Sequence, residues 1–92
     1  MGVEEVGKFL ILRRVLMECY MNLNGNSNVQ FFSIGQEHID VRFRNGGMTY
    51  RYTYQSAGKA NVETMKELAR QGFGLNSYID RYVYTGYESK WK

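Results

Sequence analysis

Three arginines, Arg42, Arg44 and Arg51, lie in a segment whose spacing places their side chains on a common face. They alternate with apolar residues across positions 39–54, and the run is interrupted by Asn45-Gly46-Gly47, residue types that accept a positive φ. This pattern predicts a β-hairpin in which a two-residue turn puts the polar residues of both strands on one side. Guanidinium groups about one strand spacing apart suit phosphate oxygens. The segment therefore predicts an anion-binding or nucleic-acid-binding face, and the alternative is a solvated face on which Asp40 pairs with Arg51 across the strands.

The same register puts Tyr50 and Tyr52 on the opposite face, together with the apolar side chains of the first hairpin strand. Tyrosines on a sheet can stack on RNA bases. Burial against a helix is the simpler interpretation for Tyr50 and Tyr52. Tyr54, at the end of the strand, suits either role and is a candidate binding residue.

Two further candidates follow the hairpin. Asn76 comes after Gly72-Phe73-Gly74 and is expected to cap a turn or to contact a ligand, and Arg81 would extend the basic surface. The single His38 and the single Cys19 do not supply the three or four ligands of a metal site. With no nucleophile or acid–base set in view, we expect no catalytic residues, no cofactor and no enzymatic activity.

The bulk composition indicates one folded domain spanning residues 1–92. The chain is 43% hydrophobic and 15% aromatic, with a net charge of +3 that permits a polyanionic partner. The lone cysteine and the absence of a secretory signal favour a cytoplasmic location, and the most apolar stretch, 9–21, is too interrupted to span a membrane.

The expected fold class is α+β. A helix is predicted over about residues 4–23, a strand over 29–34, the central hairpin over 39–54, and a helix over 62–71 with Asn61 as its N-cap and Gly72 as its C-cap. A small antiparallel sheet of about three strands would pack on helix 62–71, and the tail from Tyr87 would be frayed. The first helix is apolar over most of its circumference, which predicts a homo-oligomeric contact; the alternative is a central helix wrapped by its own chain.

The ordered motifs between Val29 and Tyr82 are similar to those of the KTSC domain. The relevant segments are Val41-Arg42-Phe43-Arg44-Asn45-Gly46-Gly47, Tyr50-Arg51-Tyr52, and Gly74-Leu75-Asn76 with Ile79. The resemblance implies a core over 29–82, with residues 1–23 as an N-terminal helical extension. The KTSC domain occurs at the C-terminus of some lysyl-tRNA synthetases and as a stand-alone protein of bacteria and phages. Its function is unknown, and RNA binding has been proposed for it because of the association with a synthetase.

Two functions remain open at this point. The first is a non-enzymatic module that binds nucleic acid, RNA rather than DNA, through the basic sheet face. The second is an oligomeric regulatory or inhibitory protein, of bacterial or phage origin, that docks on a host protein or holds a small anionic, nucleotide-like ligand between subunits. Neither reading involves a membrane.

Overall fold

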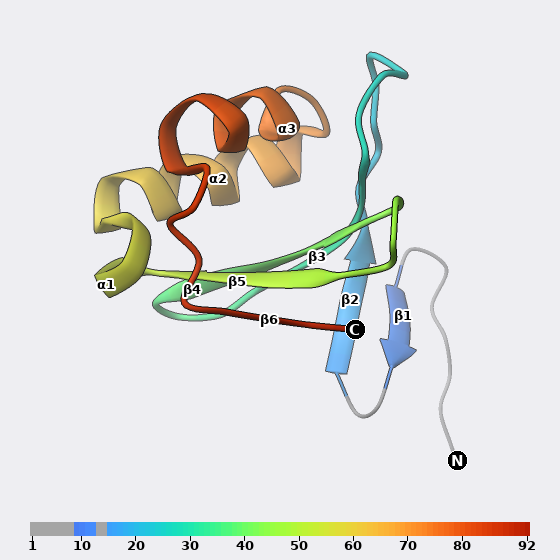
Figure 1. Cartoon of the computed structure of the whole chain (residues 1–92). Helices are drawn as coiled ribbons and strands as arrows, with labels where there is room; N and C mark the ends of the chain where they lie inside the picture. The colour runs from blue at the N-terminus through green and yellow to red at the C-terminus, as the bar shows by residue number, and fades with distance from the viewer. Residues whose placement is uncertain (1–8, 13–14) are drawn as a thin grey trace.

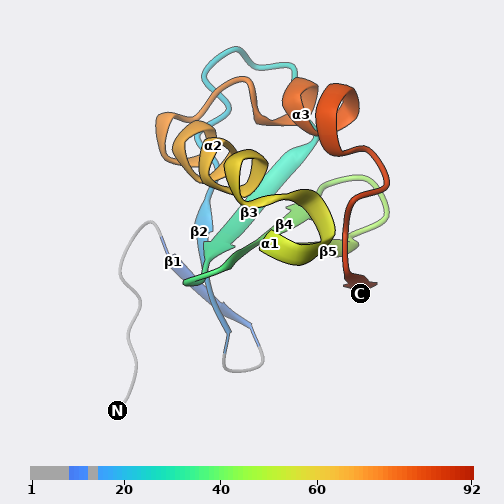
Figure 2. The same cartoon turned by 90° about the vertical axis from the view of Figure 1, so that its left-hand side faces the viewer.

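The computed structural model describes residues 9–12 and 15–92, with side chains described from position 17 onward. Within these residues the chain has the expected α+β fold, with one antiparallel sheet and helices on one of its faces (Figures 1 and 2), but the described sheet has six strands rather than about three. The sheet order is β1-β2-β3-β4-β5-β6, so each strand neighbours its successor in sequence. The strands are β1 Phe9–Leu12, β2 Val15–Cys19, β3 Val29–Ile34, β4 His38–Phe43, β5 Thr49–Thr53 and β6 Ser89–Trp91.

The helices follow β5 directly and form the second layer. They are α1 Tyr54–Ala57, α2 Lys59–Gln71, α3 Leu75–Tyr78 and a π-helical turn η1 at Ile79–Val83. The prediction of a helix over 62–71 is confirmed and Gly72 is its left-handed C-cap, with φ 86°. The helix starts earlier than expected, because Gly58 rather than Asn61 is the N-cap. The Asn61 side chain instead donates to the Ala57 carbonyl oxygen and accepts from the Tyr78 hydroxyl.

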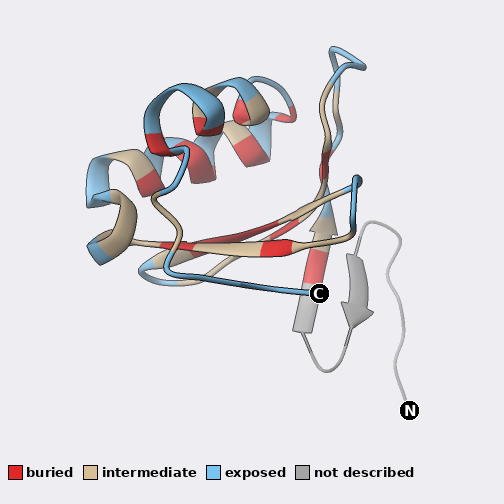
Figure 3. Cartoon of the chain, viewed as in Figure 1, coloured by how far each residue is buried: buried red, intermediate tan, exposed pale blue. Residues whose placement is uncertain are grey.

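The core lies between the helices and the sheet (Figure 3). Val62, Met65 and Ala69 recur at helical spacing on α2 and are all buried. They pack in one cluster with sheet residues such as Val41 and Tyr52. Full burial of a Val or Met side chain contributes about 1.5–3 kcal/mol, so Val62 and Met65 make this face of α2 a main attachment of the helical layer to the sheet.

The hairpin register agrees with the sequence prediction. Ile39 pairs with Tyr52, and Asp40 pairs with Arg51. Phe43 closes the ladder by donating its N–H to the Met48 carbonyl oxygen at 2.9 Å, which leaves a four-residue loop at 44–47. Ile39 and Tyr52 therefore face the helices, and Tyr52 is a core residue at 2% exposure.

The N-terminal helix predicted over about 4–23 is wrong for the described residues. Residues 9–12 and 15–19 form β1 and β2, with Leu12 paired to Val15 and Phe9 paired to Glu18. Residues 4–8 and 13–14 of that prediction lie outside the described residues. A mostly apolar segment without one clearly polar face is compatible with a β-hairpin as well as with a helix, and its β-branched residues favour strands. The oligomer argument that depended on a helix loses its basis.

The frayed C-terminal tail is also a wrong prediction. The chain crosses from the helical layer back to the sheet edge, where Ser89–Trp91 pairs with β5 as strand β6 (Figure 1). Glu88 donates its N–H to the Arg51 carbonyl oxygen at 2.7 Å and starts this pairing. Among the described residues, no helix combines the length and the apolar character needed to cross a membrane.

Candidate functional site

A hollow lies on the helical side of the sheet, between the loop end of the β4–β5 hairpin and the segment that follows α3. Its volume is about 430 Å³. We call it the tyrosine pocket, and it is lined by Asn28, Phe43, Asn45, Met48, Tyr50, Tyr52, Asn76, Ile79, Asp80, Tyr84, Thr85 and Tyr87. Aromatic rings and amide groups therefore meet in one cavity.

The aromatic wall is built from rings that hold one another at steep angles. Tyr50 and Tyr87 have centroids 4.9 Å apart and planes inclined at 75°, and Phe43 meets Tyr50 edge to face at 5.5 Å. Tyr84 also lines the pocket but is 70% exposed, so most of its ring surface is uncovered. Lys90 of β6 places its ammonium 5.8 Å from the Tyr50 centroid and 5.5 Å from the Tyr87 centroid. The wall thus has one uncovered ring and one adjacent cation.

The polar wall is organised by Asn76, whose amide has partners at both its oxygen and its nitrogen. Its Oδ1 accepts from the Asn28 N–H at 2.8 Å and from the Ser27 hydroxyl at 3.4 Å. Its Nδ2 donates to Asp80 Oδ2 at 3.3 Å. Within the described part of the chain, no hydrogen bond is made to Asp80 Oδ1. Asn76 therefore fixes the wall, as a turn-holding residue does, and leaves Asp80 with an unused acceptor.

Left-handed glycines place this wall. Gly72 and Gly74 have φ of 86° and 84°, which turn the chain sharply from α2 into α3. Leu75 then donates its N–H to the buried Tyr20 hydroxyl at 3.2 Å. Burial raises the pKa of Tyr20, and this hydrogen bond opposes the rise. The turn brings Asn76 and Asp80 against the hairpin.

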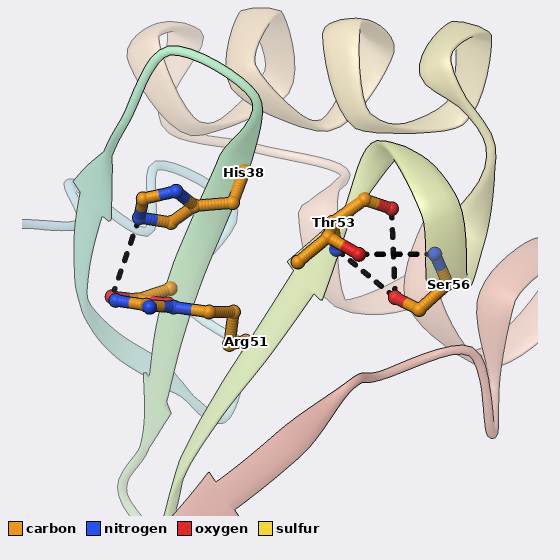
Figure 4. A network of polar contacts seen from close by, with 5 residues as sticks. His38, Arg51, Thr53 and Ser56 are labelled. Carbon is orange, nitrogen blue, oxygen red and sulfur yellow. Dashed lines mark hydrogen bonds and ion pairs between the residues drawn. The ribbon is translucent and has the colours of Figure 1, made fainter.

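Arg51, expected to be a phosphate ligand, is engaged in an ion pair on the other face of the sheet. Its Nε and Nη2 donate to the two carboxylate oxygens of Asp40 at 2.8 and 2.9 Å, as the cross-strand alternative predicted. Asp40 is only 3% exposed, whereas the Arg51 side chain is 38% exposed, so water reaches the pair from the arginine side. The hydrogen bonds to Asp40 raise the pKa of Arg51. Figure 4 shows Arg51 beside His38, whose Nε2 lies 3.8 Å from Asp40 Oδ2.

Tyr54 lies at the opposite end of the hairpin and also has partners of its own. Its hydroxyl donates to Glu63 Oε2, and its ring centroid lies 5.7 Å from the Lys59 ammonium and 5.5 Å from the Lys66 ammonium. The hydrogen bond from Tyr54, followed by that from Lys66, lowers the pKa of Glu63. Figure 4 shows how this end is held: Thr53 and Ser56 bond each other reciprocally across the start of α1.

The remaining arginines are more accessible. Arg44 is exposed in the 44–47 loop, directly before the pocket residue Asn45, and its N–H donates to the carbonyl oxygen of another pocket residue, Asn28. Arg81 is exposed and lines a smaller hollow that shares Tyr84 with the tyrosine pocket. Arg42 is half-buried beside Gly47.

The candidate residues from the sequence are therefore not gathered on one surface. Of Arg42, Arg44, Arg51, Tyr54, Asn76 and Arg81, only Asn76 lines the tyrosine pocket. The sequence analysis missed Asp80, Tyr84 and Tyr87. No periodic pattern marks the irregular segment 84–88, so only an excess of tyrosines pointed to it.

The donor groups of the site suit binding rather than metal chemistry. In residues 9–12 and 15–92, no three His, Cys, Asp or Glu side chains are placed to hold a metal ion. The pocket itself contributes hydroxyls, amides, one carboxylate and aromatic rings. Such a set recognises a flat, polar-edged ligand by stacking and hydrogen bonding.

Comparison with known proteins gives no match to a family model, to a curated protein or to a solved structure.

Proposed function

We propose that this protein is a non-enzymatic module that binds single-stranded RNA by taking a base into the tyrosine pocket. The observation that carries the proposal is that the exposed ring of Tyr84 and several amide groups line one cavity of about 430 Å³. The Lys90 ammonium lies next to this cavity, 5.8 Å from the centroid of the Tyr50 ring in its wall. Small-molecule sites occupy roughly 300–1,000 Å³, so the cavity is large enough for a nucleobase with part of its sugar. Unpaired bases are bound by aromatic stacking together with hydrogen bonds to their edges.

The charges around the pocket support an anionic strand. Lys90 approaches the aromatic wall, Arg44 precedes a lining residue, and Arg81 lies at the adjoining hollow. A strand whose base enters the pocket would place its phosphates near these cations. The similarity of residues 29–82 to the KTSC domain is part of the same proposal, because RNA binding has been proposed for that family. The basic sheet face becomes a secondary surface, since Asp40 already holds Arg51.

The first experiment measures binding directly. A labelled single-stranded RNA is titrated with the protein at about 50 mM salt, where phosphate contacts are strongest, and the titration is repeated at higher salt. We expect binding that weakens with salt by about 0.7 log units per log unit for each phosphate contacted. The same sequence as DNA tests whether the 2′-hydroxyl matters. Absence of RNA binding at low salt refutes the proposal.

The second experiment asks whether the pocket is the site, using a matched pair of tyrosines. Tyr84 and Tyr82 are both exposed, at 70% and 58%, but only Tyr84 lines the tyrosine pocket. Stacking of one base contributes about 1–3 kcal/mol, so Tyr84→Ala should weaken RNA binding at least fivefold. Tyr82→Ala should leave the affinity nearly unchanged. Equal effects of the two substitutions would move binding away from the pocket.

A second candidate function is retained because of a specific apolar surface. Met21, Leu23 and Phe73 are 62%, 60% and 43% exposed, and Leu23 donates its N–H to the Gly72 carbonyl oxygen, which joins the two segments. In this reading the protein is a homo-oligomeric regulator, of bacterial or phage origin, with a second copy covering these side chains. Sedimentation would show a dimer that Leu23→Asp dissociates. A strict monomer at high concentration would exclude this function.

A further inference from the structure

We infer that the tyrosine pocket prefers a base that presents an amino group over one that presents a carbonyl, and that Asp80 sets this preference. The inference rests on the proposed RNA-binding function and names the base chemistry that the site selects. The protein should therefore distinguish cytosine from uracil. The two rings have the same size, but cytosine carries an exocyclic amino group where uracil carries a carbonyl.

The other polar side chains of the pocket accommodate either an amino group or a carbonyl. The hydroxyls of Tyr50, Tyr52, Tyr84, Tyr87 and Thr85 both donate and accept, and they rotate to suit a partner. The amides of Asn28 and Asn45 each offer a donor at one end and an acceptor at the other, so a rotation of the amide plane accommodates either kind of edge. These groups hold a base but do not discriminate between an amino group and a carbonyl.

Asn76 offers no free acceptor, because its Oδ1 already accepts twice, and its one remaining Nδ2 hydrogen is a neutral donor that is weaker than a charged group. Its Oδ1 accepts from Asn28 and Ser27, and its Nδ2 donates to Asp80. The direction of this last bond matters. By holding Oδ2 at 3.3 Å, the Asn76 amide fixes the carboxylate of Asp80 and leaves Oδ1 as the available atom within the described residues.

Among the side chains that line the pocket in the described residues, Asp80 is the one carboxylate, and an ionised carboxylate accepts without donating. An exocyclic amino group satisfies such an acceptor, and the bond is strengthened by the charge of the carboxylate. A carbonyl oxygen in the same place would meet the exposed Asp80 carboxylate as acceptor against acceptor, so no hydrogen bond would form between them. The carboxylate also repels phosphates, but that repulsion acts on every RNA alike and does not alter the ratio between two bases.

The test uses short oligomers of cytidine and of uridine, titrated against the full chain near neutral pH at about 50 mM salt. We expect the cytidine oligomer to bind roughly tenfold more tightly, the ratio that one charge-assisted base contact gives. In Asp80→Asn the side chain gains a donor, so the ratio should fall to about one or reverse. Glu88→Gln is the matched control: it removes one negative charge from an exposed residue outside the pocket and should preserve the ratio.

A second measurement needs no variant protein. Cytidine whose amino group carries two methyl groups keeps its ring and its charge but loses both donors, and an oligomer of it should bind the wild-type chain as weakly as the uridine oligomer does. Equal binding of cytidine and uridine oligomers, or an unchanged ratio in Asp80→Asn, overturns the preference while the proposed function stands. If neither oligomer binds, both the function and the preference fall.

Discussion

Replacement of Arg51 by Met should destabilise the fold because it leaves a buried carboxylate without its main partner. Asp40 has a side-chain exposure of 4% and receives two hydrogen bonds from Arg51, at 2.8 and 2.9 Å. Methionine keeps an aliphatic side chain and removes the guanidinium, and with it the cation–π contact in which Cζ lies 5.5 Å from the centroid of the Trp91 ring. The remaining neighbour, His38, is 3.8 Å away and does not replace two short hydrogen bonds.

The size of the effect follows from which charge is stranded. Removal of one partner of a buried ion pair costs about 3–5 kcal/mol. The Arg51 side chain is 38% exposed, so water screens part of the interaction, and the lower end of that range, about 3 kcal/mol, is expected. In Asp40→Asn the stranded group is the half-exposed guanidinium, which can turn to water, and the cost should be only about 1 kcal/mol.

Urea unfolding of the two single variants and the double variant completes a cycle. Arg51→Met should lower the thermal midpoint by roughly 15 °C in a domain of this size. The double variant should be more stable than Arg51→Met alone, with a coupling energy of about 2 kcal/mol. Arg70→Met is the control, because Arg70 and Glu67 form a 3.5 Å pair with side chains 55% and 61% exposed. Its cost should not exceed about 0.5 kcal/mol.

An order of effects other than this would refute the reasoning. If Arg51→Met costs no more than Arg70→Met, the Asp40 carboxylate reaches water despite its low exposure. If Asp40→Asn costs more than Arg51→Met, the arginine is the buried charge of the pair. The first result would also return Arg51 to the residues available for a phosphate.

Three further outcomes are expected. Gly72→Ala should lower the free energy of unfolding in urea by about 2 kcal/mol, because φ is 86° and the added Cβ would lie 2.8 Å from the Met21 Cβ. Gly25→Ala, with φ 76° and open space around it, should show only the cost of the positive φ, about 1 kcal/mol. Equal costs of the two substitutions would contradict the packing argument. Glu63 has a lowered pKa, so its contribution to stability is present above its unfolded pKa of 4.5 and is lost as pH falls through the folded pKa. The thermal midpoint of Glu63→Gln should therefore approach that of wild type as pH falls below 4.5. A difference in thermal midpoint that does not change with pH would contradict this. Burial raises the pKa of Tyr52, so its contribution to stability is present below the unfolded pKa of 10.0 and is lost as pH rises above that value. Tyr52→Phe should therefore lose less stability than wild type between neutral and strongly alkaline pH. Equal losses in the two proteins would contradict this prediction.

The parts of the fold that sequence could predict are those with a strong period and clear punctuation. The hairpin had strict alternation on both sides of Asn45-Gly46-Gly47, and its Asp40–Arg51 register follows. The α2 stripe ended at a glycine and was identified for the same reason. The first 23 residues had no polar face to orient them, so helix and hairpin were both compatible with the pattern.

The tyrosine pocket could not be predicted from the sequence for a different reason. It joins the hairpin loop to residues 76–87, which approach it only because two glycines turn the chain between α2 and α3. Alternation fixes which side of a strand a tyrosine occupies, but it does not say what stands opposite. For this reason Tyr50 was expected to be purely structural, although it also lines the pocket with Tyr87.

The strand order has a consequence for how fast the molecule folds. From β1 to β5 every strand pairs with its immediate predecessor, so each pairing closes a short loop and needs little chain search. Only β6 must wait, because 35 residues of helix and loop, 54–88, separate it from β5. Folding rate falls as contacting residues become more distant in sequence. The meander should therefore form early and the β6 edge late, which means that the Lys90 side of the tyrosine pocket is completed last.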